Sequence, residues 1–255
     1  MPRVIGKLLR WVAGRPTTPQ SPHPPALRAA RPALLLFGLA LLAAQGCARV
    51  PDEVTGDQVR RRLTVSFSVA GQVNPQYFYF IAIDADGNPS SGPVPVVTAP
   101  FGNGWVTGSV THYVEFHLGV FGVFRFVPDT NLLVADSLGS PFEFNQPQQP
   151  PGNRISATLD VDRTLGTDVN LINLNIITTD RIDIDPTFTG TKIFDALGAS
   201  GNQFLTLPLN VTQTFTNAQS PDPETAGDLP PASSQGVDFS ALDITDWTIQ
   251  VQVRQ

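Results

Sequence analysis

The chain is poor in sulfur: its 255 residues include one cysteine, Cys47, and one methionine, Met1. A single cysteine excludes a disulfide within the chain, so a domain of this size depends on its apolar core for stability. If an N-terminal leader is removed, no methionine remains, which excludes His–Met ligation of haem. We therefore expect no cofactor, apart from the calcium ion considered below.

Long helical patterns are also missing, because no apolar run with a period of 3.6 extends over ten residues or more. Instead, Leu63, Val65, Phe67 and Val69 alternate with Thr64, Ser66 and Ser68. Similar alternation recurs in the segments 110–118, 155–162, 172–176, 182–185, 205–211 and 247–253. Such runs, separated by Gly, Pro and Asp turns, are typical of half-buried antiparallel strands. The sequence predicts an all-β fold, an antiparallel two-sheet β-sandwich of jelly-roll-like type.

Basic residues are scarce outside the first 46 positions. Six of the 16 basic residues precede Cys47, whereas all 22 acidic residues follow it, and Lys192 is the only lysine there. Such an acidic surface repels nucleic acid, so no nucleic-acid partner is expected. The run Arg60-Arg61-Arg62 is interpreted as the solvated start of a strand.

The N-terminal residues have the layout of a secretory signal peptide. Basic residues are followed by an apolar run of 12 residues, 33–44, too short for the roughly 20 residues that span a bilayer. The sequence Ala44-Gln45-Gly46-Cys47 then resembles the lipobox of bacterial lipoproteins, although Ala44 stands where leucine is usual. The resemblance implies cleavage before Cys47, its acylation, and a lipid-anchored, extracytoplasmic place in the cell envelope with the membrane as partner. The alternative is an ordinary secreted protein with a stray cysteine.

These observations predict three regions: a signal peptide of lipoprotein type (1–46), a tether (47–59) and a single β-sandwich domain (60–255). The most aromatic stretch of the domain is residues 77–83, in which neither alternating face is polar. Such a strand is either covered on both sides or shows an aromatic face to a ligand. The pattern favours the covered strand.

Residues 77–92 (YFYFIAIDADGNPSSG) resemble the strand and acidic turn of DOMON-like and family 9-like carbohydrate-binding β-sandwiches. The resemblance covers about a tenth of the domain. It implies a sandwich that binds sugars or, in some relatives, haem, with the loop acids and nearby aromatic residues as candidates.

Two acidic groups are candidates for metal binding. Asp84, Asp86 and Asn88 have the alternating oxygen spacing of a calcium loop, although Pro89 stands where glycine is needed. A weaker group comprises Asp180, Asp183 and Asp185. Zinc is disfavoured, because His112 and His117 fall on opposite faces of a regular strand.

The remaining candidate residues favour binding over catalysis, and we expect that the protein is not an enzyme. Glu115 with Glu143, or Glu115 with His117, could serve a hydrolase only if the fold placed them together in a cleft. Exposed indole and phenol rings can stack on sugars, and the candidates are Trp105, Tyr77, Tyr79 and Tyr113. The first hypothesis is a lipid-anchored β-sandwich that binds a glycan. The alternatives are a structural envelope lipoprotein that presents its aromatic face to a protein partner, and a hydrolase.

Overall fold

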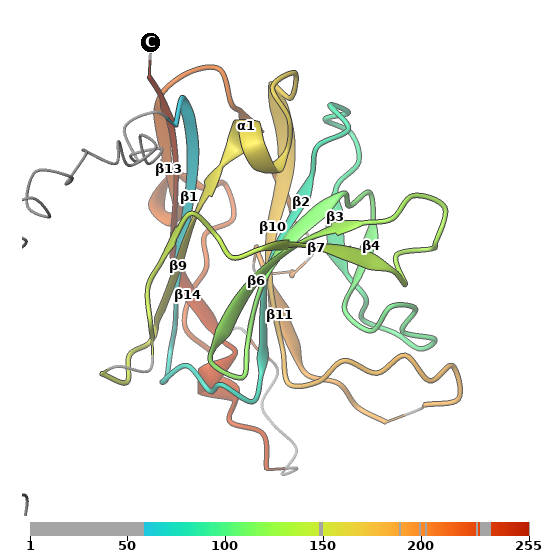
Figure 1. Cartoon of the computed structure of the whole chain (residues 1–255). Coiled ribbons are helices and arrows are strands. Elements are labelled where there is room, and N and C mark those ends of the chain that lie inside the picture. The colour runs from blue at the N-terminus through green and yellow to red at the C-terminus, as the bar shows by residue number, and fades with distance from the viewer. Residues whose placement is uncertain are drawn as a thin grey trace, which may run out of the picture. The chain divides into compact units, whose positions relative to one another are not determined.

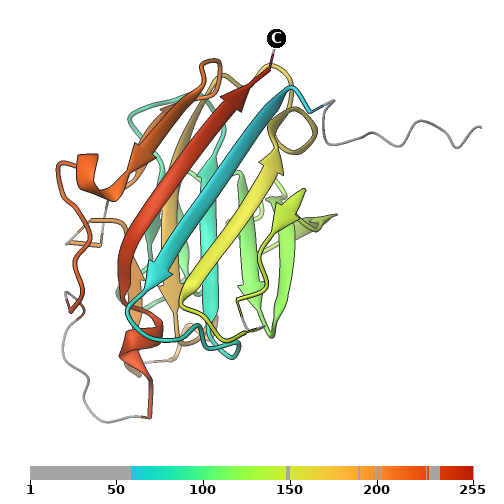
Figure 2. The same cartoon turned by 90° about the vertical axis from the view of Figure 1, so that its left-hand side faces the viewer.

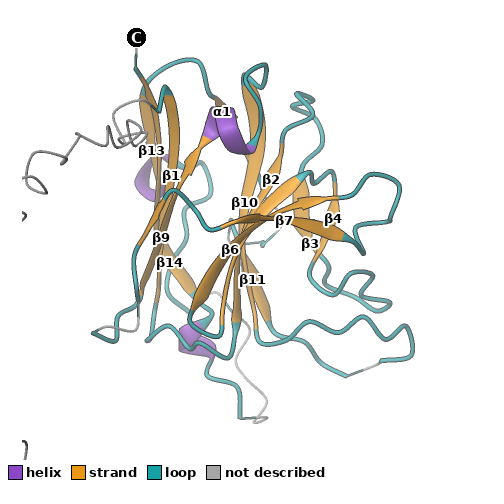
Figure 3. Cartoon of the chain, in the orientation of Figure 1, coloured by secondary structure: helices purple, strands orange, loops and turns teal. Residues whose placement is uncertain are grey.

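A computed structural model describes residues 59–254, except for 148–149, 189, 199, 202, 228 and 230–235. Signal peptide, tether and Cys47 lie outside the described residues. Two antiparallel sheets pack face to face (Figures 1 and 3), so the predicted all-β sandwich is confirmed. The described part of the chain contains no helix longer than α1 (Val161–Thr164), in agreement with the missing helical period.

Sheet A has five strands in the order β13-β14-β1-β9-β8. Their bounds are β13 Gln213–Thr216, β14 Ile244–Val253, β1 Arg61–Val69, β9 Arg154–Asp160 and β8 Glu143–Phe144. The central strand β1 pairs with β14 from Arg61↔Val253 onward and with β9 from Arg62↔Asp160 onward. Two segments far apart in sequence therefore form the middle of this sheet.

Sheet B has seven strands, in the order β11-β10-β2-β5-β6-β7 with β12 also paired to β10. Their bounds are β11 Phe194–Ala196, β10 Leu171–Thr179, β2 Phe78–Asp84, β5 His112–His117, β6 Val120–Phe126, β7 Ala135–Gly139 and β12 Leu205–Pro208. A separate hairpin of β3 (Pro93–Pro95) and β4 (Val106–Gly108) lies beyond sheet B in Figure 1.

The main core lies between the two sheets and is built from one face of each strand. Leu63, Val65 and Phe67 of β1 are buried there, as the alternation predicts. Tyr79, Ile81 and Ile83 of β2 meet them from sheet B. Because alternate strand residues point to opposite faces, Thr64, Ser66 and Ser68 of β1 point out of the sandwich.

A second, smaller core covers the opposite face of sheet B. Phe80 and Ala82 of β2 are buried there with Trp105 and Val106 of the hairpin region. The strand β2 is therefore covered on both sides, and the preferred interpretation of residues 77–83 is confirmed. The hypothesis of a protein partner needs an exposed aromatic face on this strand. Most of that face is covered by other residues of the same chain.

Two of the three short helices in the described residues are capped at their start by a side chain. The Asp160 carboxylate accepts from the backbone N–H of Arg163 at the start of α1. Asp238 does the same for Ser240 at η3 (Phe239–Ala241), whereas η2 (Asn217–Gln219) has no side-chain cap. Such caps satisfy N–H groups that a helix start leaves without partners.

Candidate functional site

The outer face of sheet A carries the polar half of each alternating strand. The register aligns these residues in rows across the sheet: Thr214, Gln250, Thr64, Thr158 and Glu143 in one, and Thr216, Thr248, Ser66 and Ser156 in the next. Hydroxyl pairs bridge the strands, Thr64 to Thr158 at 3.0 Å and Ser66 to Ser156 at 2.6 Å. The face therefore presents hydroxyl and amide groups in a fixed arrangement.

A groove of about 430 Å³ is hollowed into this face, and we name it the sheet A groove. It is lined by Arg62, Thr64, Glu143, Phe144, Asn145, Ser156, Thr158, Gln250 and Gln252. These side chains supply guanidinium, carboxylate, amide and hydroxyl groups, all of which form hydrogen bonds with sugar hydroxyls. Phe144, which is 44 % exposed, also borders the groove, but it pairs with the core residue Ala157 and its ring lies 5.1 Å from the ring of Phe121 in the main core, so the ring points away from the outer face.

Local contacts hold the groove residues in place. The Arg62 guanidinium lies 4.9 Å from the centre of the Phe142 ring, and one of its nitrogens is 3.6 Å from Glu143 Oε1. Asn145 is held to β9, because its Nδ2 donates to Arg154 O and its Oδ1 accepts from Ser156 N. Figure 2 shows β14, β1 and β9 facing the viewer, with no described segment crossing in front of them. The groove is open to a large ligand.

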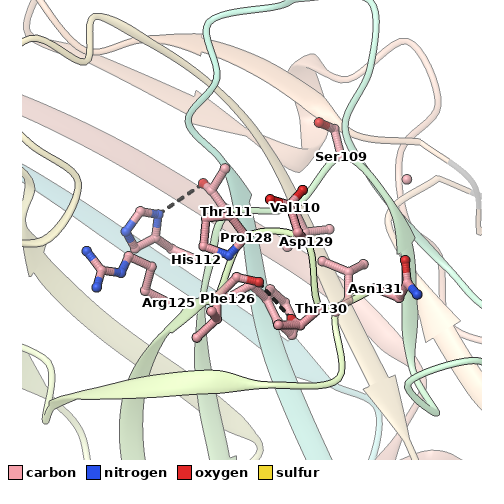
Figure 4. A pocket seen from close by; sticks show the side chains of 13 residues that line it. Ser109, Val110, Thr111, His112, Arg125, Phe126, Pro128, Asp129, Thr130 and Asn131 are labelled. Carbon is pink, nitrogen blue, oxygen red and sulfur yellow. Dashed lines mark hydrogen bonds between the residues drawn. The ribbon is translucent and has the colours of Figure 1, made fainter.

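A second hollow of about 780 Å³, which we name the loop groove, lies at one end of sheet B between residues 108–112 and 125–132. Figure 4 shows His112 and Arg125 together on one flank. Burial, with the Arg125 charge as a lesser cause, lowers the pKa of His112 to about 4, so this imidazole is neutral at pH 7. Arg125 is paired with Asp136 at 3.2 Å. The loop groove thus offers a neutral histidine, and its one arginine is already paired.

The loop groove is bounded by backbone in an unusual conformation. Asp129, Asn131 and Leu132 all have positive φ, at 62°, 52° and 60°. Asparagine and aspartate tolerate this region, but leucine does so at a cost of order 1 kcal/mol or more. Leu132 packs against the second core, and this packing holds the conformation.

Trp105 and Tyr79 are not exposed, and the expectation that they form a sugar platform is wrong. Trp105 is 4 % exposed because its ring stacks on Phe80, with ring centres 3.8 Å apart. Tyr79 is 2 % exposed; its hydroxyl donates to Ala241 O and accepts from Asn74 N. Neither ring can meet a sugar face without unpacking the protein.

The side chains of Tyr77 and Tyr113 are half-buried and form contacts within the protein. The Tyr77 hydroxyl accepts from the backbone N–H of Asp238 at 2.7 Å. The Tyr113 ring stacks on Phe124 at 4.9 Å and meets Trp105 edge-on at 5.1 Å. Burial raises the pKa of Tyr113 to about 12. The four aromatic candidates do not converge on a groove, since none of them lines either hollow.

The acidic turn after β2 is only partly as expected for a calcium loop. Asp84 and Asp86 stay close together, but the Asn88 side chain is used within its own turn, where Oδ1 accepts from Ser90 N and Nδ2 donates to Ser91 Oγ. In the part of the chain that the structure describes, no group of three or more His, Cys, Asp or Glu side chains could hold a metal ion.

The second acidic group does not assemble. Asp180 pairs with Arg181 and accepts from Ile193 N, while Asp183 and Asp185 each accept from a backbone N–H two residues later. All three are turn residues.

The proposed carboxylate pair is separated by the fold. Glu115 lies on β5 of sheet B, opposite Phe80 and Gly122, whereas Glu143 lies on β8 of sheet A. Burial raises the pKa of Glu115, and the nearby His117 lowers it by less. The His117 ring, however, stacks on Phe78 at 3.8 Å and its Nδ1 contacts Tyr77 O, so it is fixed by packing. His112 and His117 face opposite sides of β5, as the spacing predicts.

The sheet A groove was not predicted because its residues come from four segments whose pairing the sequence does not state. The available signal was the polar half of the alternating runs at 63–69, 155–162 and 247–253.

Within the residues described above, no helix is both long and apolar enough to cross a membrane. Comparison with family models, with curated proteins and with solved structures finds no match for this chain. The function is therefore argued from the geometry.

Proposed function

We propose that this protein is a lipid-anchored, extracytoplasmic β-sandwich that binds a neutral glycan across the outer face of sheet A. The observation that carries the proposal is the sheet A groove, where the amides of Asn145, Gln250 and Gln252 stand on one open face with the hydroxyls of Thr64, Ser156 and Thr158. Sugars present a rim of hydroxyls, and the groove offers hydrogen-bond donors and acceptors for them.

The charges of the molecule favour a neutral ligand. Arg62 and Glu143, the two charged side chains of the groove, lie 3.6 Å apart and offset each other. The chain as a whole carries a formal net charge of −6, and its acidic residues all follow Cys47. An anionic polysaccharide would be repelled by such a surface.

The test uses isothermal titration calorimetry with neutral gluco-, xylo- and manno-hexaoses, and with an anionic uronate oligomer for comparison. We expect one neutral oligosaccharide to bind, and Gln250→Ala and Gln252→Ala each to weaken binding by about tenfold or more, the effect of losing an important contact in an interface. The control is Ile184→Ala, which removes an exposed side chain (65 %) from a loop outside the groove.

The two variants also distinguish binding from folding. Gln250 and Gln252 both lie on the outer face of sheet A, so their loss leaves the melting temperature within a few degrees of the wild type. Binding that is unchanged in both variants, or no binding by any oligosaccharide, refutes the assignment of this groove.

The proposed anchor has a separate test. Cys47→Ser removes the thiol to which a lipid is attached, so the protein should move from the detergent phase to the aqueous phase, or remain unprocessed. The control is Ala48→Ser, which should partition as the wild type does. Unchanged detergent partitioning of Cys47→Ser contradicts acylation at this residue.

A further inference from the structure

Asp84, the last residue of β2, is a fully buried carboxylate in which one oxygen has no hydrogen-bond donor among the described residues. Its exposed fraction is 0 %, and its Oδ1 accepts from the backbone N–H of Asp86 at 3.2 Å. Its Oδ2 is also buried and has no hydrogen-bond partner among the described residues. A buried polar atom of this kind is costly unless another species satisfies it.

Two oxygen-bearing side chains stand beside this carboxylate. The Asp86 carboxyl and the Ser109 hydroxyl are both close enough to Asp84 to shift its pKa. Ser109 Oγ also donates to Asp86 Oδ2 at 3.2 Å. Burial is the largest cause of the raised pKa of Asp84, and the negative charge of Asp86 adds to it. Two neighbouring carboxylates, one of them buried, form a site of excess negative charge.

No basic side chain compensates this charge. The ion pairs found within residues 59–254, outside the gaps, join Arg61 to Asp162, Arg62 to Glu143, Arg125 to Asp136 and Arg181 to Asp180. None includes Asp84 or Asp86. Asp86 is exposed and Ser109 lines the loop groove, whereas Asp84 is fully buried, so an ion would approach Asp84 from the side of Asp86 and Ser109.

We propose that this corner binds a hard divalent cation, Ca²⁺, through Asp84 Oδ2, Asp86 Oδ2 and Ser109 Oγ, with water completing the shell. Ca²⁺ takes six to eight oxygen ligands in flexible geometry, whereas Mg²⁺ demands a near-ideal octahedron and Zn²⁺ prefers nitrogen and sulfur. Two carboxylates and a hydroxyl give a modest affinity, with a Kd on the order of 10⁻⁴–10⁻³ M, as in extracellular calcium modules. The ion supplies the partner that Asp84 Oδ2 lacks.

The test measures the melting temperature of the full chain at pH 7.5 in EGTA and in CaCl₂. At about 100-fold excess over Kd, Ca²⁺ should raise the melting temperature by about 5 °C or more, and the same concentration of MgCl₂ by less. Calorimetric titration with CaCl₂ gives the Kd and stoichiometry directly. No change of melting temperature and no heat at 10 mM CaCl₂ would overturn the proposal.

Two variants assign the response to this corner. Asp84→Asn removes the buried charge, so it should melt above the wild type in EGTA and lose the calcium response. Ser109→Ala keeps the fold, because Ser109 is a partly exposed loop residue, and should raise the Kd for Ca²⁺ several-fold. The matched control is Asp183→Asn, which alters another turn aspartate and should retain the full response. A full response in both Asp84→Asn and Ser109→Ala places the ion elsewhere and refutes the assignment.

Discussion

Trp105→Ala is expected to destabilise the fold by about 3–5 kcal/mol, the range for removing a large buried aromatic side chain. The Trp105 ring is 4 % exposed and stacks on Phe80 on one side while Tyr113 meets its edge. Its removal leaves a cavity that the surrounding strands cannot fill by small shifts. For a domain of about 200 residues, we expect the melting temperature to fall by about 10 °C.

The loop around Trp105 explains why the ring is held in place. Asn103 Oδ1 accepts from the backbone N–H groups of Trp105 and Val106, and Lys192 Nζ donates to Gly104 O. Gly104 has a φ of 93°, and a Cβ at this position would lie 2.4 Å from a methyl group of Ile182. These contacts hold the loop on both sides, so the indole ring cannot rotate into solvent.

The control is Phe144→Ala, which removes an aromatic ring that is 44 % exposed. We expect Phe144→Ala to lower the free energy of unfolding by clearly less than Trp105→Ala does, because the half-exposed Phe144 ring has one core contact, with Phe121 at 5.1 Å. Trp105→Ala should leave oligosaccharide binding unchanged at temperatures where it remains folded. Thermal and urea unfolding of both variants decide the point: a Trp105→Ala protein as stable as the wild type would contradict the buried position.

Arg61→Ala is expected to lower the free energy of unfolding by about 3 kcal/mol, because it removes a buried cation that forms several hydrogen bonds. Arg61 is 8 % exposed, pairs with Asp162 through Nε at 2.6 Å, and donates to the carbonyl oxygens of Gly166, Thr167 and Val169. One guanidinium thereby fixes α1 and the loop that leads into β10. Its loss leaves several acceptors and one carboxylate without their donor.

The matched control is Arg125→Ala, which breaks the exposed pair with Asp136. Both of those side chains are more than half exposed, and such surface pairs are worth about 0–1 kcal/mol. Arg61→Lys should recover only part of the loss, since an ammonium group cannot reproduce the planar fork of donors. Urea unfolding in low and high salt is the measurement; equal losses for Arg61→Ala and Arg125→Ala would refute the structural role of Arg61.

The strands of the sandwich could be predicted because their residues alternate in sequence. Leu63, Val65 and Phe67 point into the core as the pattern indicates, and residues 77–83 form the doubly covered strand that their lack of a polar face favours. These are local properties of consecutive residues. They are independent of which strands become neighbours.

The functional candidates could not be predicted in the same way, because exposure depends on distant segments. Trp105 stands in a glycine-rich loop that suggests an open position, yet Phe80 stacks on it and Lys192 ties the loop down. The run Arg60-Arg61-Arg62 suggests a solvated strand start, yet Arg61 is buried against a loop more than a hundred residues later. Gln250 and Gln252 could not be recognised as groove residues, since only the pairing of β14 with β1 places them beside Thr64 and Arg62.

The pairing of β1 with β14 sets the order of events during synthesis. The ribosome delivers β1 long before β14, and until then β1 can pair only with β9. Sheet A therefore cannot close while the chain is being made, and its assembly waits on a contact of very long range, which is slow to form. Until β14 is made, the edge of β1 that it later covers keeps backbone N–H and C=O groups without their native partners.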